Sequence, residues 1–95
     1  MTVELNAVIE VPEELAGEAE LAIVRSVAHA RTHPGCQFYA GYRDRDQMGR
    51  FVLIERWASI EMLDAHGLTE PSRAFRRSLR DFGAVTRITR LDPMG

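Results

Sequence analysis

Residues 55–66 contain two side chains that are suited to acid–base chemistry, Glu55 and His66, with Trp57 between them. A histidine has an ordinary pKa of about 6.5, so it can take up a proton at neutral pH. Glu55 and Trp57 are two positions apart and therefore share one face of a strand. We expect Glu55 to pair with an arginine, with service to a catalytic site as the alternative. His66 is expected either to act on a substrate or to hydrogen-bond carbonyl groups at the end of its helix.

Two further histidines have a spacing that can hold a metal ion. His29 and His33 are one helical turn apart and would lie on the same helix face. A metal site needs at least a third protein ligand, and the sequence near them offers none that we can identify. We therefore predict no metal site. The single cysteine, Cys36, excludes an internal disulfide and is expected to be a small buried residue.

The charged residues argue against several classes of protein. The 95 residues include 12 basic and 14 acidic ones, for a net charge of -2, and every basic residue is arginine. Nucleic-acid-binding proteins are usually strongly basic, so no nucleic-acid partner is expected. Without lysine, neither a Schiff base nor a P-loop can form. Arg73, Arg77 and Arg80 would share one helix face, which is either solvated or in contact with an acidic substrate.

The hydrophobic residues indicate one globular domain over residues 1–95. The longest apolar runs, such as residues 51–54, are far shorter than the roughly 18–20 residues that span a bilayer. No basic segment followed by an apolar one begins the chain, so we expect no signal peptide and a cytoplasmic protein. No membrane partner is expected.

The spacing of apolar residues predicts the elements that must position these side chains. Alternation predicts a strand over residues 2–11, and a three- and four-residue repeat predicts a helix over 12–32. Two strands follow at 36–43 and 51–58, joined by a polar loop. Ser59 is expected to cap a short helix, Thr69 or Ser72 a second helix ending near Phe82, and a last strand covers 85–91.

The order β-α-β-β-α-β predicts an α+β, ferredoxin-like fold, in which helices cover one face of a four-stranded antiparallel sheet. The strands carry apolar residues on both faces, as residues 51–54 show. A solvated face would carry polar residues instead. We therefore expect a second copy of the chain to cover the free face, giving a homodimer.

Residues 51–66, FVLIERWASIEMLDAH, resemble the signature of the antibiotic biosynthesis monooxygenase family: a strand ending Glu-x-Trp, a serine cap, and a helix ending Leu-x-x-His. Residues 33–39, HPGCQFY, are similar to the family's Pro-Gly-Cys lead into its second strand, and residues 69–75 resemble its segment after the histidine. The resemblance covers nearly the whole chain and implies a dimeric α+β barrel.

The resemblance also implies a cofactor-independent monooxygenase that oxidises a phenolic, polyketide or quinol-type aromatic substrate with molecular oxygen. Two alternatives stay open: a ligand-binding or interaction dimer without activity, and a haem-binding or haem-degrading relative. The catalytic candidates are His66 and Trp57. The candidates for binding the substrate are Asn6, Phe38, Tyr39, Tyr42, Phe51 and Phe75.

Overall fold

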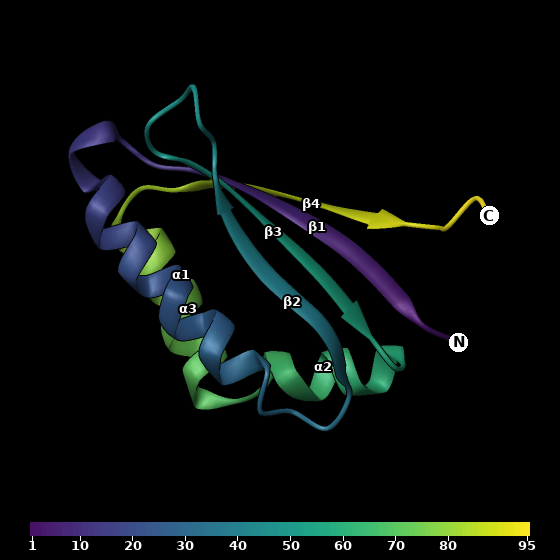
Figure 1. Cartoon of the computed structure of the whole chain (residues 1–95). Helices are drawn as coiled ribbons and strands as arrows, with labels where there is room; N and C mark the ends of the chain where they lie inside the picture. The colour runs from purple at the N-terminus through teal and green to yellow at the C-terminus, as the bar shows by residue number, and fades with distance from the viewer.

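Four strands and three α-helices make up the protein, as seen in a computed structural model that describes all 95 residues (Figure 1). The strands are β1 (Val3–Glu10), β2 (Cys36–Arg43), β3 (Arg50–Trp57) and β4 (Val85–Leu91), and the helices are α1 (Ala16–Ala30), α2 (Ile60–Gly67) and α3 (Glu70–Asp81). The strands form one sheet in the order β2-β3-β1-β4, in which every neighbouring pair is antiparallel. The predicted ferredoxin-like α+β fold is confirmed.

Local sequence explains where the helices begin and end. The segment predicted as one helix from residue 12 is divided, because a 3-10 turn at Glu13–Leu15 precedes α1. The Ser59 hydroxyl caps α2 by accepting a hydrogen bond from the Met62 amide at 3.2 Å. Thr69, rather than Ser72, caps α3. After α3, Gly83 adopts a φ of 70°, a left-handed conformation that glycine enters without steric cost.

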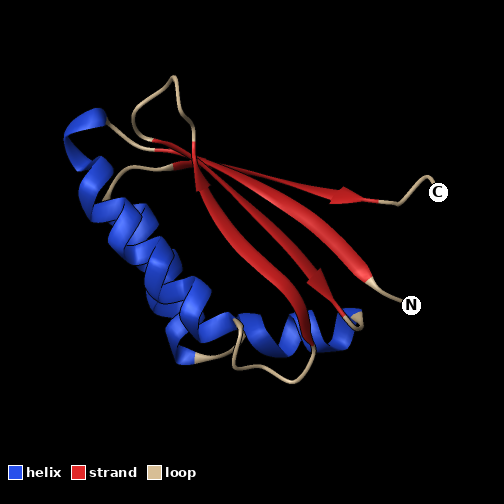
Figure 2. Cartoon of the chain, in the orientation of Figure 1, coloured by secondary structure: helices blue, strands red, loops and turns tan.

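The helices all lie on one side of the sheet (Figure 2). We call this side the inner face and the opposite side the outer face. Inner-face positions alternate along the strands, and the central ones, including Leu5, Leu53 and Trp57, are buried. Trp57 is fully enclosed and Ile9 is 1% exposed, so both anchor the core. No residue of the edge strand β4 is buried, whereas the other edge strand, β2, contains buried Tyr39 and Ala40.

Gly35 lets the loop between α1 and β2 approach α2 closely. Its carbonyl oxygen accepts a hydrogen bond from the Ala58 amide at 2.8 Å, which joins this loop to the end of β3. A Cβ atom on Gly35 would overlap the side chain of Met62 on α2. The absence of a side chain at position 35 therefore allows the loop and α2 to pack directly against each other.

Replacing Gly35 tests this contact. We expect Gly35→Ala to lower the free energy of unfolding by about 1–3 kcal/mol, because Met62 must move to admit the methyl group. Gly17→Ala is the matched control, since a Cβ on Gly17 in α1 meets no atom within 4 Å. Urea denaturation measures both variants. Equal stability of the two variants would show that the close contact has no energetic importance.

Candidate active site

A pocket of about 710 Å³ lies between the inner face of the sheet and the helices α2 and α3. About half of its 21 lining residues are hydrophobic. They include Leu5 and Ala7 from β1, Leu63 from α2, and Phe75 and Leu79 from α3. The polar groups Tyr39, Glu55 and His66 also line it. The pocket therefore combines apolar walls with a few polar side chains, as sites for small organic ligands commonly do.

His66 is held at the end of α2 by contacts on several sides. Its Nε2 lies 3.2 Å from the Ser72 hydroxyl oxygen. The ring packs against Trp57, with 4.6 Å between the ring centroids. The Thr69 hydroxyl donates a hydrogen bond to the backbone carbonyl of His66 at 2.7 Å, which fixes the turn between α2 and α3. His66 Nδ1 is buried and has no hydrogen-bond partner.

The surroundings of His66 favour its neutral form. Burial, together with repulsion of a positive charge by His33, His29 and Arg76, lowers the pKa of His66 to about 4. At neutral pH the imidazole is therefore uncharged. One ring nitrogen carries a proton and the other has a free lone pair.

Glu55 is a buried carboxylate that is held by a tryptophan. Trp57 Nε1 donates a hydrogen bond to Glu55 Oε1 at 2.9 Å. Burial raises the pKa of the Glu55 carboxyl, whereas hydrogen bonds from Trp57 and Tyr39 act in the opposite direction. Burial and the Glu55 charge also raise the pKa of Tyr39. The expected arginine partner of Glu55 is absent from the chain's ion pairs, so that prediction was wrong within one chain.

Three arginines give the pocket positive charge: Arg76 and Arg80 line it from α3, and Arg90 lines it from β4. Of the three arginines predicted to share a helix face, only Arg80 reaches the pocket. Arg77 donates a hydrogen bond to Glu70 at 2.6 Å. The arginine side chains can stabilise an anionic group on a bound molecule.

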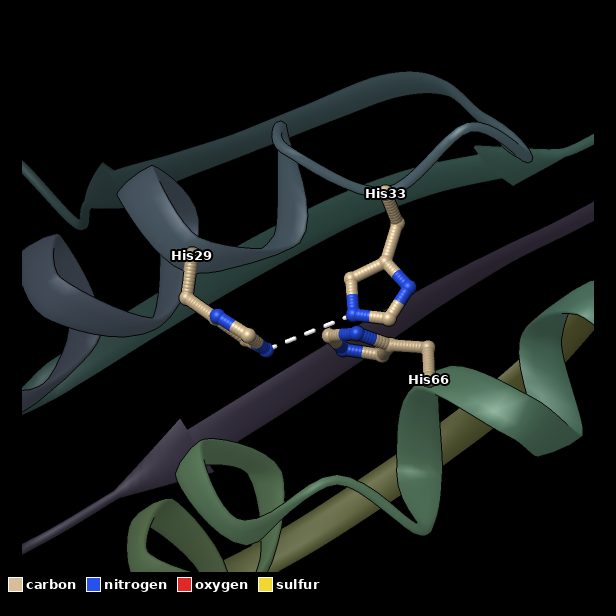
Figure 3. Close-up of side chains that lie close together, drawn as sticks. All are labelled: His29, His33 and His66. Carbon is tan, nitrogen blue, oxygen red and sulfur yellow. Dashed lines mark hydrogen bonds between the residues drawn. The ribbon is translucent and has the colours of Figure 1, made fainter.

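The histidines at positions 29 and 33 lie beside His66 (Figure 3). One ring nitrogen from each of the three histidines lies within 4.8 Å of the others. His29 Nε2 and His33 Nε2 are 3.4 Å apart. The expectation that no third ligand accompanies His29 and His33 was therefore wrong, because the fold brings His66 to them.

Comparison with known proteins places this geometry in a family. The family model described as antibiotic biosynthesis monooxygenase matches residues 2–78. The chain belongs to this family. No curated protein sequence matches the chain.

Solved structures agree with this family assignment. PA3566 from Pseudomonas aeruginosa is 26% identical, with a TM-score of 0.92 and coverage of 99% of this chain and 95% of that one. Rv0793 from Mycobacterium tuberculosis is 22% identical, with a TM-score of 0.90 and coverage of 100% and 97%. An antibiotic biosynthesis monooxygenase is 22% identical, with a TM-score of 0.91 and full coverage of both chains. Family membership supports a monooxygenase-type function. No helix is long and apolar enough to cross a membrane.

The structure brings together only some of the residues predicted for the monooxygenase site. His66, Tyr39 and Phe75 line the pocket. Trp57 lies behind the pocket lining, against His66 and Glu55, so it supports the site rather than forming its wall. Phe51 lies in the hydrophobic core and does not line this pocket.

Three predicted residues lie on the other side of the sheet. Asn6, Phe38 and Tyr42 are not among the pocket residues. Their strand register places them on the outer face, since Asn6 is aligned with exposed Ile54 and Phe38 with exposed Arg56. Neighbours along a strand point to opposite faces, so Phe38 and Tyr39 cannot both reach one pocket. Asn6, Phe38 and Tyr42 therefore do not line this pocket, contrary to the prediction.

The sequence interpretation also missed residues of the site. Ser72 and Thr69 were considered as helix caps and as part of the segment after the histidine, but not as contacts of His66, yet both hydrogen-bond to it. Arg76 and Arg90 were not singled out as pocket residues. The spacing of Arg76 relative to Phe75 and Leu79 on α3 is the only signal that could have placed it beside the pocket.

The pH dependence of folding stability tests whether the Glu55 charge is buried. Because the pKa of Glu55 is raised by folding, its contribution to stability is present at low pH and is lost as the pH rises through the folded-state pKa. Glu55→Gln keeps a carbonyl acceptor for Trp57 and cannot ionise. We expect it to be more stable than the wild type at pH of about 8, by roughly 1 kcal/mol, and to lose that advantage at pH of about 4.

Thermal or urea unfolding across this pH range measures the difference. Glu61→Gln removes a carboxylate from an exposed position on α2 and serves as the control. A stability difference for Glu55→Gln that stays constant with pH would contradict the assigned burial of charge.

Proposed function

We propose that the protein is a cofactor-independent monooxygenase that oxidises a phenolic, polyketide or quinol-type aromatic substrate with molecular oxygen. One observation carries this proposal: a largely apolar pocket contains a buried carboxylate with raised pKa, Glu55, and a neutral imidazole, His66. Family membership supports the same general reaction type.

The substrate itself would supply all four electrons that reduce O2 in this reaction. A hydroquinone and one O2 molecule give a hydroxyquinone and one water molecule, so atoms and electrons balance without an external reductant. The first requirement is removal of a proton from the substrate, because the resulting anion passes an electron to oxygen more readily. A dry pocket with a positioned base meets this requirement.

Glu55 is the group proposed to accept the proton. Its raised pKa makes it a stronger base than an ordinary carboxylate. Trp57 and Tyr39 hold the carboxylate by hydrogen bonds, and Glu55 lines the pocket, where a substrate hydroxyl would meet it. His66 is proposed to hydrogen-bond the substrate oxygen as a neutral imidazole. The arginines Arg76, Arg80 and Arg90 would favour the phenolate form.

Oxygen consumption tests this assignment. Purified protein is mixed with anthrones or hydroquinones in an oxygen electrode, and products are identified by mass spectrometry. We expect Glu55→Gln and His66→Gln each to lower kcat by about 100-fold or more, as loss of a general base or of a hydrogen bond to developing charge commonly does. Glu61→Gln, on the exposed side of α2, should retain wild-type turnover.

Trp57→Phe separates positioning from catalysis. This variant keeps an aromatic ring against His66 but removes the hydrogen bond to Glu55, which holds the pKa of that carboxyl down. The acid limb of the kcat profile should therefore move to higher pH.

Turnover that is the same in wild-type, Glu55→Gln and His66→Gln proteins would overturn the proposed roles. Absence of oxygen uptake with every aromatic compound tested would favour a binding protein.

We also propose that the chain forms a homodimer through the outer face of its sheet. Phe38 and Tyr42 of β2 are exposed there, two residues to either side of the position that pairs with exposed Ile54 of β3, and Leu91 is exposed on β4 at the other edge. Apolar side chains on a free sheet face favour association, because burying them removes apolar surface from water. A second copy presents the same surface and can pack against it symmetrically.

A charge placed on the outer face tests the dimer. Ile54→Asp should shift the protein from dimer to monomer in sedimentation velocity, because an aspartate would be buried without a partner. Leu21→Asp is the control, since Leu21 is an exposed hydrophobic residue on α1, away from the outer face. A wild-type protein that is monomeric at micromolar concentration would contradict the proposal.

A further inference from the structure

All three histidines of the chain meet at one place (Figure 3). His29 lies in the last turn of α1, His33 in the loop that follows it, and His66 in the last turn of α2. Two segments that are distant in sequence are therefore brought together around imidazole side chains. The Gly35 contact with Met62 helps to place the His33 loop beside α2.

One of the three nitrogen separations already matches that of a metal site. Zn–N bonds of about 2.0–2.1 Å in tetrahedral geometry place two nitrogen ligands roughly 3.3–3.4 Å apart. His29 Nε2 and His33 Nε2 are 3.4 Å apart, and the three candidate nitrogens all lie within 4.8 Å of one another. Ring rotation that shortens the longest separation by roughly 1–1.5 Å would complete the geometry.

His66 has a buried nitrogen that nothing in the chain satisfies. Its Nε2 is next to the Ser72 hydroxyl at 3.2 Å, whereas Nδ1 is buried without a partner. Leaving such an atom unpaired costs roughly 1–3 kcal/mol. If Nε2 donates its proton to Ser72, the Nδ1 lone pair is free to bind a cation. Ligating histidines are commonly oriented in this way by a hydrogen bond at their other nitrogen.

The protonation state of His29 follows from the same network. The Thr69 hydroxyl gives its only proton to the His66 carbonyl at 2.7 Å, so it can only accept from His29 Nε2 at 3.3 Å. His29 Nε2 therefore carries a proton, which also faces the lone pair of His33 Nε2. A metal ion would displace this proton to His29 Nδ1, and both Nε2 atoms would then point lone pairs at the ion.

We propose that His29, His33 and His66 form a binding site for a divalent first-row transition metal ion such as Zn²⁺. Three neutral imidazoles suit Zn²⁺, Co²⁺, Ni²⁺ and Cu²⁺, whereas Mg²⁺ and Ca²⁺ prefer oxygen ligands. Three protein ligands leave a fourth coordination position for water or another small ligand. This site shares His66 with the proposed oxygenase reaction but goes beyond it, because that reaction does not use His29 or His33.

Nuclear magnetic resonance of the histidine side chains tests the site directly. Untagged full-length protein, treated with a chelator and then dialysed, is titrated with Zn²⁺ while ¹H–¹⁵N correlations of the imidazoles are recorded. The three histidines are the only ones in the chain, so each ring can be followed. We expect one equivalent of Zn²⁺ to shift His29 Nε2, His33 Nε2 and His66 Nδ1, with the other nitrogen of each ring protonated.

Affinity measurements on variants provide the second readout. Calorimetry should give a dissociation constant in the micromolar range or tighter for wild-type protein, and His29→Gln, His33→Gln and His66→Gln should each weaken binding by at least about 10-fold. Cys36→Ser is the matched control, because Cys36 is the chain's only cysteine and begins β2, three residues after His33. Its affinity should equal that of the wild type. Mg²⁺ and Ca²⁺ should give no heat of binding.

The outcomes are clear even if a variant folds poorly, because the resonance experiment uses wild-type protein. Zn²⁺ that shifts no histidine, or shifts only one or two, would overturn the site. Loss of binding in Cys36→Ser would also overturn it. No substrate is present in either experiment, so failure of the oxygenase proposal leaves this result unchanged, and failure of metal binding leaves oxygen consumption to be judged separately.

Discussion

The hydrogen bond from Trp57 to Glu55 joins the core of the protein to its pocket. Trp57 is fully enclosed, so its indole N–H must find an acceptor within the protein. Glu55 provides that acceptor at 2.9 Å and in turn is held away from water. The Trp57 ring also packs against the imidazole ring of His66. One large side chain thus sets the positions of both polar groups proposed to act on a substrate.

Much of the fold could be predicted from the sequence, because the alternating residues of β1 and the helical repeat of α1 are strong local signals. The order of the elements then allowed few topologies. The site was harder to predict. Phe38 and Tyr39 are adjacent and chemically similar, but a strand sends them to opposite faces, and only the register shows that Tyr39 is the one facing Glu55.

Contacts between distant segments account for the other differences. His29 and His33 were recognisable as a pair, yet nothing in their neighbourhood indicated that the end of α2 would lie beside them. The partner of Glu55, expected to be an arginine, could also not be identified from the sequence alone. Burial selects a partner by proximity in space, and here the nearest donor is on the same strand, two residues away.

The edge strand β4 is the part of the pocket wall that can accept substitutions most easily. It supplies Thr86, Ile88 and Arg90 to the pocket, yet none of its residues is buried in the single chain. Exposed positions tolerate substitution with little loss of stability. Mutations on this wall can therefore alter the size and charge of the accepted molecule while the Trp57 core stays intact. Such a wall is a favourable starting point for directed evolution of what the pocket admits.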